Sequence, residues 1–148
     1  MKKTTMSITS PAPATKEPII ALPIGRMVGS IVGLSALTYA GWLAVVWLGG
    51  FGAEAVAAGL AGAALVAAVG VAAALLMRPW RPRPLSSWVT WWLAGIVGRV
   101  LVTPAVAYLL YSATSLSGTP LLLSVATTYV IVQCGEAAAL ALHIKRVT

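Results

Sequence analysis

The sequence predicts an all-α membrane protein whose four transmembrane helices are arranged as two antiparallel hairpins. Hydrophobic residues make up 59% of the chain and charged residues only 9%, whereas soluble domains carry roughly 25% charged residues. Four apolar stretches are each long enough to cross a hydrocarbon core of about 30 Å. Nearly all basic residues behind the net charge of +7 lie outside these stretches. The charge therefore indicates membrane topology rather than nucleic-acid binding, and the lipid bilayer is the first expected partner.

Residues 1–25 are predicted to form a disordered tail on the cytoplasmic side. Four prolines between residues 11 and 23 rule out a long helix, and the polar composition is typical of a mobile segment. The apolar run that follows comes too late and is too long for a secretory signal peptide. Within the tail, residues 19–24 are apolar enough to lie at the membrane surface.

Residues 26–77 are predicted to form the first hairpin, with a tight glycine-rich turn between its helices. The first helix carries glycines on one row, at Gly25, Gly29, Gly33 and Gly41. Small residues at four-residue spacing let two helix backbones approach closely. We therefore predict that this row packs against another helix, either within the chain or in a partner. Glu54 begins the second helix, where a carboxylate favours the positive end of the helix dipole.

Residues 78–85 are predicted to form a basic cytoplasmic connector, since its prolines exclude a helix and its arginines exclude the bilayer interior. The residues expected to set topology or to bind lipid headgroups are Arg78, Arg81, Arg83, Lys145 and Arg146. The turns after the first and third apolar stretches carry no lysine or arginine. By the positive-inside rule, both termini are expected on the cytoplasmic side of the cell inner membrane.

Residues 86–148 are predicted to form the second hairpin, in which each helix contains one interior ionisable residue, Arg99 or Glu136. A charge in hydrocarbon costs about 2.5–3.5 kcal/mol on insertion scales, and such residues usually mark function. Helix side chains lean toward the helix N-terminus, so these two lean toward each other in an antiparallel pair. The expected intramembrane polar site consists of Arg99, Thr103, Tyr129, Gln133 and Glu136.

Two interpretations of this polar site are open. In the first, Arg99 and Glu136 form a buried ion pair that fixes the register of two helices packed side by side. In the second, one or both face a partner subunit or a hydrated pathway and bind a charged partner or an ion. Aromatic residues at both ends of the first helix of this hairpin are expected at the membrane interfaces, namely Trp88, Trp91, Trp92, Tyr108 and Tyr111. Pro104 is expected to bend that helix.

The sequence offers no catalytic or metal-binding set. It contains no Ser/His/Asp arrangement, no HExxH motif, no paired carboxylates and no phosphate-binding loop. His143 and Cys134 are each the only residue of their type, so they cannot build a metal site or a disulfide within the chain. We therefore predict a protein that is not an enzyme and that carries no cofactor.

The second hairpin resembles a known family. The segment Trp92–Tyr111 has a small-residue face and one mid-helix arginine. A short turn with Pro120 follows it, and Leu121–Val147 then carries Tyr129, Gln133 and Glu136 and ends in basic residues. This pattern resembles the ATP synthase subunit I family, small membrane proteins encoded with rotary F-type ATP synthases, to which the glycine row and the four-helix plan are also similar.

The resemblance implies a non-catalytic accessory role in assembly of the c ring, with c subunits as partners and a suggested role in supplying divalent cations such as Mg²⁺. Arg99 and Glu136 would then be the working residues, and the glycine row the packing face. Two alternatives are a small ion or solute transporter or channel that uses Arg99, Gln133 and Glu136, and a structural subunit of another membrane complex. The rotor subunit itself is excluded, because no GxGxGxG run is present and a tight ring has no room for three tryptophans.

Overall fold

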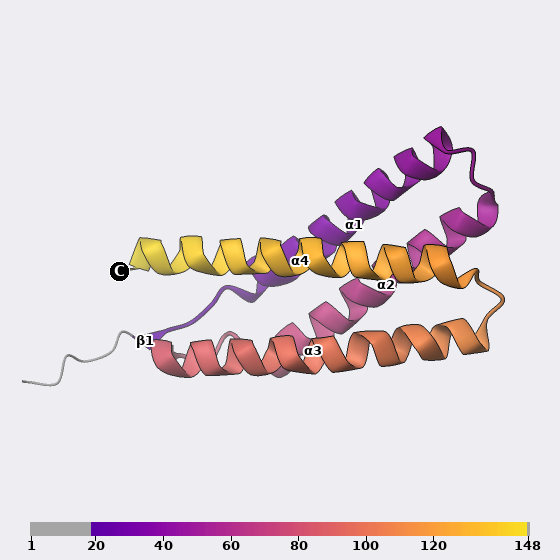
Figure 1. Cartoon of the computed structure of the whole chain (residues 1–148). Coiled ribbons are helices and arrows are strands. Elements are labelled where there is room, and N and C mark those ends of the chain that lie inside the picture. Colours follow the sequence, from indigo (N-terminus) through magenta and orange to yellow (C-terminus); the bar gives the residue numbers. More distant parts are fainter. Residues whose placement is uncertain (1–18, 148) are drawn as a thin grey trace, which may run out of the picture.

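The computed structural model describes residues 19–147, and over this range the fold consists of helices apart from two very short strands (Figure 1). The helices are α1 (Ile24–Leu48), α2 (Ala53–Leu76), α3 (Leu85–Ala113) and α4 (Gly118–Val147). All four are long and apolar enough to cross a membrane. This confirms the prediction of an all-helical chain with four such helices and indicates a multi-pass membrane protein. Most of the predicted tail, residues 1–18, lies outside the described residues.

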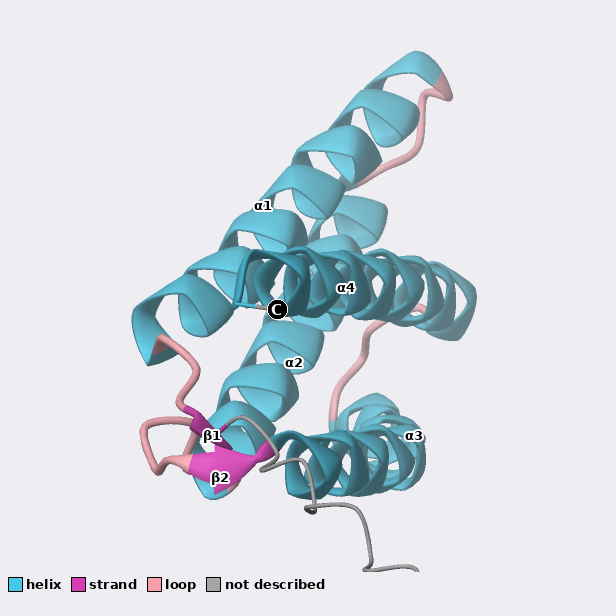
Figure 2. Ribbon diagram, turned by 90° about the vertical axis from the view of Figure 1, so that its left-hand side faces the viewer, coloured by secondary structure: helices cyan, strands magenta, loops and turns pink. Residues whose placement is uncertain are grey.

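The central helix of the bundle is α2, which packs against α1, α3 and α4. α4 also packs extensively against α1. The axes of α3 and α4 run alongside each other in Figure 1, and α1 and α2 cross them obliquely. Figure 2 looks along α3 and α4 and shows them apart. Among the helix pairs that pack on each other, α3 and α4 make the fewest contacts. The expected side-by-side packing of these two helices is therefore wrong over most of their length.

The small side chains of α2 explain why it takes the central position. A Cβ atom at Gly62 would lie 2.8 Å from Ser124 Oγ and 3.1 Å from the backbone nitrogen of Val125. Only glycine therefore lets α4 approach α2 this closely. On the α1 side, Gly70 faces Ile31. Buried apolar residues from all four helices form the core, among them Ile31, Leu65, Val66, Ala107, Leu121 and Val132.

A short segment before α1 crosses one end of the bundle. We call residues 19–23 the N-terminal strap. The basic end is our name for the end of the bundle at which α1 begins, the connector crosses and α4 ends. The strap contains β1 (Ile19–Ile20), which pairs antiparallel with β2 (Arg83–Pro84) of the connector. This corrects part of the predicted tail, since residues 19–25 are ordered. The reason is that the extended connector presents backbone groups with which the strap can pair.

Two further hydrogen bonds anchor the strap. The backbone N–H of Leu22 donates to the carbonyl of Pro79 at 2.9 Å, and the indole Nε1–H of Trp88 donates to the carbonyl of Ile20 at 2.8 Å. Ile20, Leu22 and Trp88 are buried together. Trp88 is therefore a structural anchor of the strap, in addition to being an aromatic residue near a helix end.

Trp88→Phe is expected to weaken the docking of the strap by about 1 kcal/mol, the net value of one hydrogen bond, because phenylalanine lacks the indole N–H. Hydrogen exchange at the Leu22 amide should then accelerate roughly fivefold. Trp47→Phe is the matched control, because Trp47 is 83% exposed at the other end of α1. Unchanged exchange at Leu22 in the Trp88→Phe variant would show that the indole does not anchor the strap.

Candidate functional site

The intramembrane charges pair within the chain. Arg99 comes from the middle of α3 and Glu136 from α4, and the guanidinium Nη1 of Arg99 donates to the carboxylate Oε2 of Glu136. The two residues are only 4% and 7% exposed. Because α3 and α4 otherwise make few contacts, this ion pair is a principal direct link between them. The first interpretation of the charges, an internal pair, therefore describes the structure, although the pair joins two helices that lie apart.

The other predicted polar residues gather around the pair. Thr103, Tyr129 and Gln133 line the same small hollow as Arg99, next to α2. In this group, several buried polar atoms have no hydrogen-bond partner, namely Arg99 Nε, Thr103 Oγ1, Tyr129 OH, Gln133 Oε1 and Glu136 Oε1. Each unpaired buried group costs about 1–3 kcal/mol. Both members of the ion pair, and the three polar residues beside it, therefore have polar atoms that could form further hydrogen bonds.

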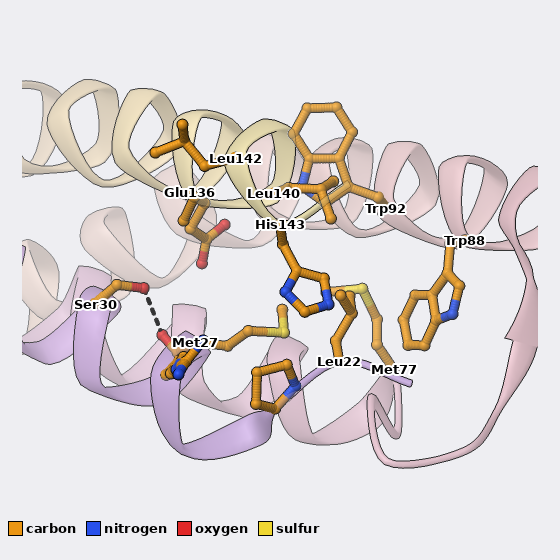
Figure 3. A pocket seen from close by; sticks show the side chains of 13 residues that line it. Leu22, Met27, Ser30, Met77, Trp88, Trp92, Glu136, Leu140, Leu142 and His143 are labelled. Carbon is orange, nitrogen blue, oxygen red and sulfur yellow. Dashed lines mark hydrogen bonds between the residues drawn. The ribbon is translucent and has the colours of Figure 1, made fainter. Parts of the chain in front are cut away.

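A cavity of about 230 Å³ reaches Glu136 from the basic end (Figure 3). Its walls are formed by the N-terminal strap, the start of α1, the start of α3 and the last turns of α4. Met77, which follows the end of α2, also lines the cavity. The side chains that line it are mostly apolar, among them Leu22, Met27, Met77, Trp88, Trp92 and Leu140. In Figure 3 the carboxylate of Glu136, the imidazole of His143 and the two methionine side chains project toward the same space.

Sequence reasoning missed this cavity, although helical spacing gave a signal for it. Trp88 and Trp92 are four residues apart and share a face of α3. Glu136, Leu140 and His143 likewise share a face of α4. Their position near a helix end indicates only that these tryptophans lie at the membrane interface. The missing information was the strap, whose position over these faces no periodicity predicts.

The predicted glycine row packs against none of the described residues 19–147. Its members Gly25, Gly29, Gly33 and Gly41 are exposed, and a Cβ atom at any of them would meet nothing within 4 Å. The glycines that pack closely on other helices are different ones, namely Gly59, Gly62, Gly70 and Gly135. Among the described residues the row therefore has no partner helix, and packing against a helix of another protein stays a prediction.

The basic residues at the basic end differ in their surroundings. Arg78, Arg81 and Lys145 are exposed, whereas the guanidinium of Arg83 lies over the rings of Trp88 and Trp91, at 5.6 and 4.7 Å from their centroids. Arg83 therefore holds the connector against α3 by cation–π contacts. Arg146 lies in the last turn of α4.

The other candidate residues contribute no second site. Glu54 lies in the first turn of α2, as expected for a carboxylate near a helix N-terminus. Cys134 is a free, exposed cysteine. Within residues 19–147, no group of three or more histidine, cysteine, aspartate or glutamate side chains could hold a metal ion.

No protein-family model matches the chain, and neither a curated protein nor a solved structure matches it. Its function must therefore be inferred from the ion pair, the polar cluster and the cavity.

Proposed function

We propose that the protein is a small transporter in the membrane, with Glu136 as the group that binds the transported ion or solute and Arg99 as its internal counter-ion. The observation that supports this most is the position of Glu136. Its buried carboxylate pairs with Arg99 and also lines a cavity at the basic end. A buried carboxylate that a ligand can reach through a cavity is a typical binding group of membrane carriers.

The geometry suggests how binding could be linked to movement. Arg99 donates to Oε2 of Glu136 and leaves Oε1 without a partner, so a ligand cation at Oε1 would share the negative charge with Arg99 and weaken the ion pair. When Arg99 releases it, α3 loses a principal direct link to α4, because these helices make few other contacts. Ligand binding would then favour a different position of α3, as expected when a ligand stabilises one of two conformations.

The proposed topology places the cavity on the cytoplasmic side. The two hairpins, α1 with α2 and α3 with α4, would both have their turns outside. The basic end would face the cytoplasm, with Arg78, Arg81 and Lys145 in water or at lipid headgroups. Thr103, Tyr129 and Gln133 would continue the polar pathway beyond the ion pair.

Glu136→Gln is expected to reduce flux through reconstituted liposomes by roughly 10- to 100-fold, since a hydrogen bond to a charged group contributes about 1.5–3 kcal/mol. The assay would compare a panel of small cations, including protons followed with a pH-sensitive dye inside the liposomes. Glu54→Gln is the matched control, because it removes an exposed carboxylate from α2. If Glu136→Gln transports every cation as well as the unmodified protein does, the transporter proposal is wrong.

A second candidate is an accessory subunit of the membrane sector of an F-type ATP synthase. The outward glycine row on α1 favours it, because open space over Gly29 and Gly33 suits close approach of a partner helix. The row would then serve assembly, as the resemblance to the subunit I family implies.

Gly29→Leu with Gly33→Leu is expected to abolish recovery of a partner subunit while the chain itself stays folded, since both positions have open space. Affinity purification in mild detergent, followed by identification of c subunits, would test this. Recovery of no synthase component by the unmodified protein would exclude the accessory role. Undiminished recovery by the double variant would show that the row is not the docking face.

A further inference from the structure

We propose that the cavity at the basic end binds a protonated amine with a flat apolar body, with its ammonium group at Glu136 and its body between the tryptophan and methionine side chains. This inference rests on the proposed function, for which it names the class of solute.

The walls of the cavity suit a flat apolar group. Trp88 is 3% exposed, and its indole is held in place by the hydrogen bond to the carbonyl of Ile20. Trp88 therefore forms a fixed part of the wall, and the half-buried Trp92 offers the more open aromatic surface for stacking. Met27 and Met77 face the same space in Figure 3, and thioether side chains adapt to the outline of whatever packs on them.

The charges around the cavity favour a cation. Glu136 is buried, so water weakens its electrostatic attraction little, and its Oε1 has no hydrogen-bond partner. The Trp88 indole already has the Arg83 guanidinium 5.6 Å from its centroid, so Trp92 is the indole in the cavity wall that can attract a ligand cation. Arg26 and His143 border the cavity as well, but Arg26 is exposed, so water and salt screen its charge. Ser30 Oγ already donates to the carbonyl of Met27 at 2.8 Å.

The polar cluster offers Arg99 other hydrogen-bond partners when Glu136 turns to a ligand. Gln133 Oε1 and Tyr129 OH are buried without partners, and both residues line the hollow that Arg99 also lines. Amide and phenol oxygens accept hydrogen bonds from a guanidinium. Glu136 can therefore give Oε1 to an ammonium group while Arg99 shares its donors with Gln133 and Tyr129. This gives a role to polar atoms that the internal ion pair leaves unused.

Three probes with one naphthalene body and different head groups would test the class of ligand: 1-naphthylmethylammonium, 1-naphthalenemethanol and 1-naphthoate. Binding would be measured by equilibrium dialysis against the full chain in nanodiscs of zwitterionic lipid, with empty nanodiscs subtracted. We expect the ammonium to bind at least about tenfold more tightly than the alcohol, because a charge-assisted hydrogen bond is the stronger one. The naphthoate should not bind above the empty nanodiscs.

Three variants keep this test decisive. Glu136→Gln should remove the tenfold preference for the ammonium, whereas Glu54→Gln should keep it. Ala139→Phe places a ring in the cavity from an exposed position on its border, so it should abolish binding of both the ammonium and the alcohol. Equal binding of ammonium and alcohol to the unmodified protein would mean that apolar partition alone fills the cavity, and it would overturn the inference.

The outcome is separate from that of the transport assay. Selective binding of the ammonium without flux of the same ammonium or of any small cation in liposomes would support the ligand class and remove the transporter. Flux of another cation without ammonium binding would support the transporter and overturn the ligand class.

Discussion

Arg99→Met alone is expected to destabilise the folded protein by about 3–5 kcal/mol, because it leaves the charge of Glu136 buried and uncompensated. Glu136 is 7% exposed. Its Oε2 accepts from Arg99, and its Oε1 has no partner, so the variant would leave both oxygens without a donor. The free energy of unfolding would be measured by titration with SDS in mixed micelles. A stability equal to that of the unmodified protein would show that Glu136 does not depend on Arg99 for compensation.

The double variant Arg99→Met with Glu136→Met distinguishes compensation from net stabilisation. Replacing a buried ion pair by apolar residues of similar size is often neutral or stabilising by about 1–4 kcal/mol. We therefore expect the double variant to recover the stability that Arg99→Met loses, yet to bind no ammonium. If the double variant is as unstable as the single one, the pair itself holds α3 against α4, and a purely structural role is favoured.

Gly62→Leu is expected to destabilise the protein by about 3 kcal/mol, the upper part of the usual range for overpacking. Even a single Cβ at this position would meet Ser124 Oγ and the backbone of Val125. Ser124 cannot move aside freely, because its hydroxyl donates to the carbonyl of Gly59 at 2.8 Å. The larger side chain would therefore push α4 away from α2, and the loss of stability would be measured in the same SDS titration.

Gly33→Leu is the matched control for Gly62→Leu. It adds the same side chain to α1, where nothing lies within 4 Å, so the expected change is within about 0.5 kcal/mol. Equal losses in the two variants would mean that glycine flexibility in the helices, rather than the α2–α4 contact, limits stability.

The helices could be predicted from the sequence because their signal is local. Runs of apolar residues, bounded by glycine, proline and charge, determine where α1 to α4 begin and end to within a few residues. The neighbours of each helix could not be predicted in this way. α2 and α1 both carry glycines, yet those of α2 pack inside the bundle while the row Gly25 to Gly41 faces outward. The difference depends on the side chains opposite, such as Ser124, which no spacing within one helix reveals.

The ion pair was the predictable part of the site, and the cavity was not. Arg99 and Glu136 lean toward each other because the direction of each helix fixes the lean of its side chains. The cavity needs the N-terminal strap, and residues 19–23 have too little periodicity to predict a docked segment. Its ordering follows from hydrogen bonds to Pro79 and Trp88, which are distant in the sequence.

The strap also has a consequence for biosynthesis. Ile20 and its indole partner Trp88 are 68 residues apart, and chains are synthesised from the N-terminus. The strap therefore leaves the ribosome long before the connector and α3 exist to hold it. α1 and α2 can pack together first, whereas the binding cavity is completed only when α3 and then α4 have been synthesised. A chain whose synthesis stops before Trp88 would therefore have an incomplete basic end.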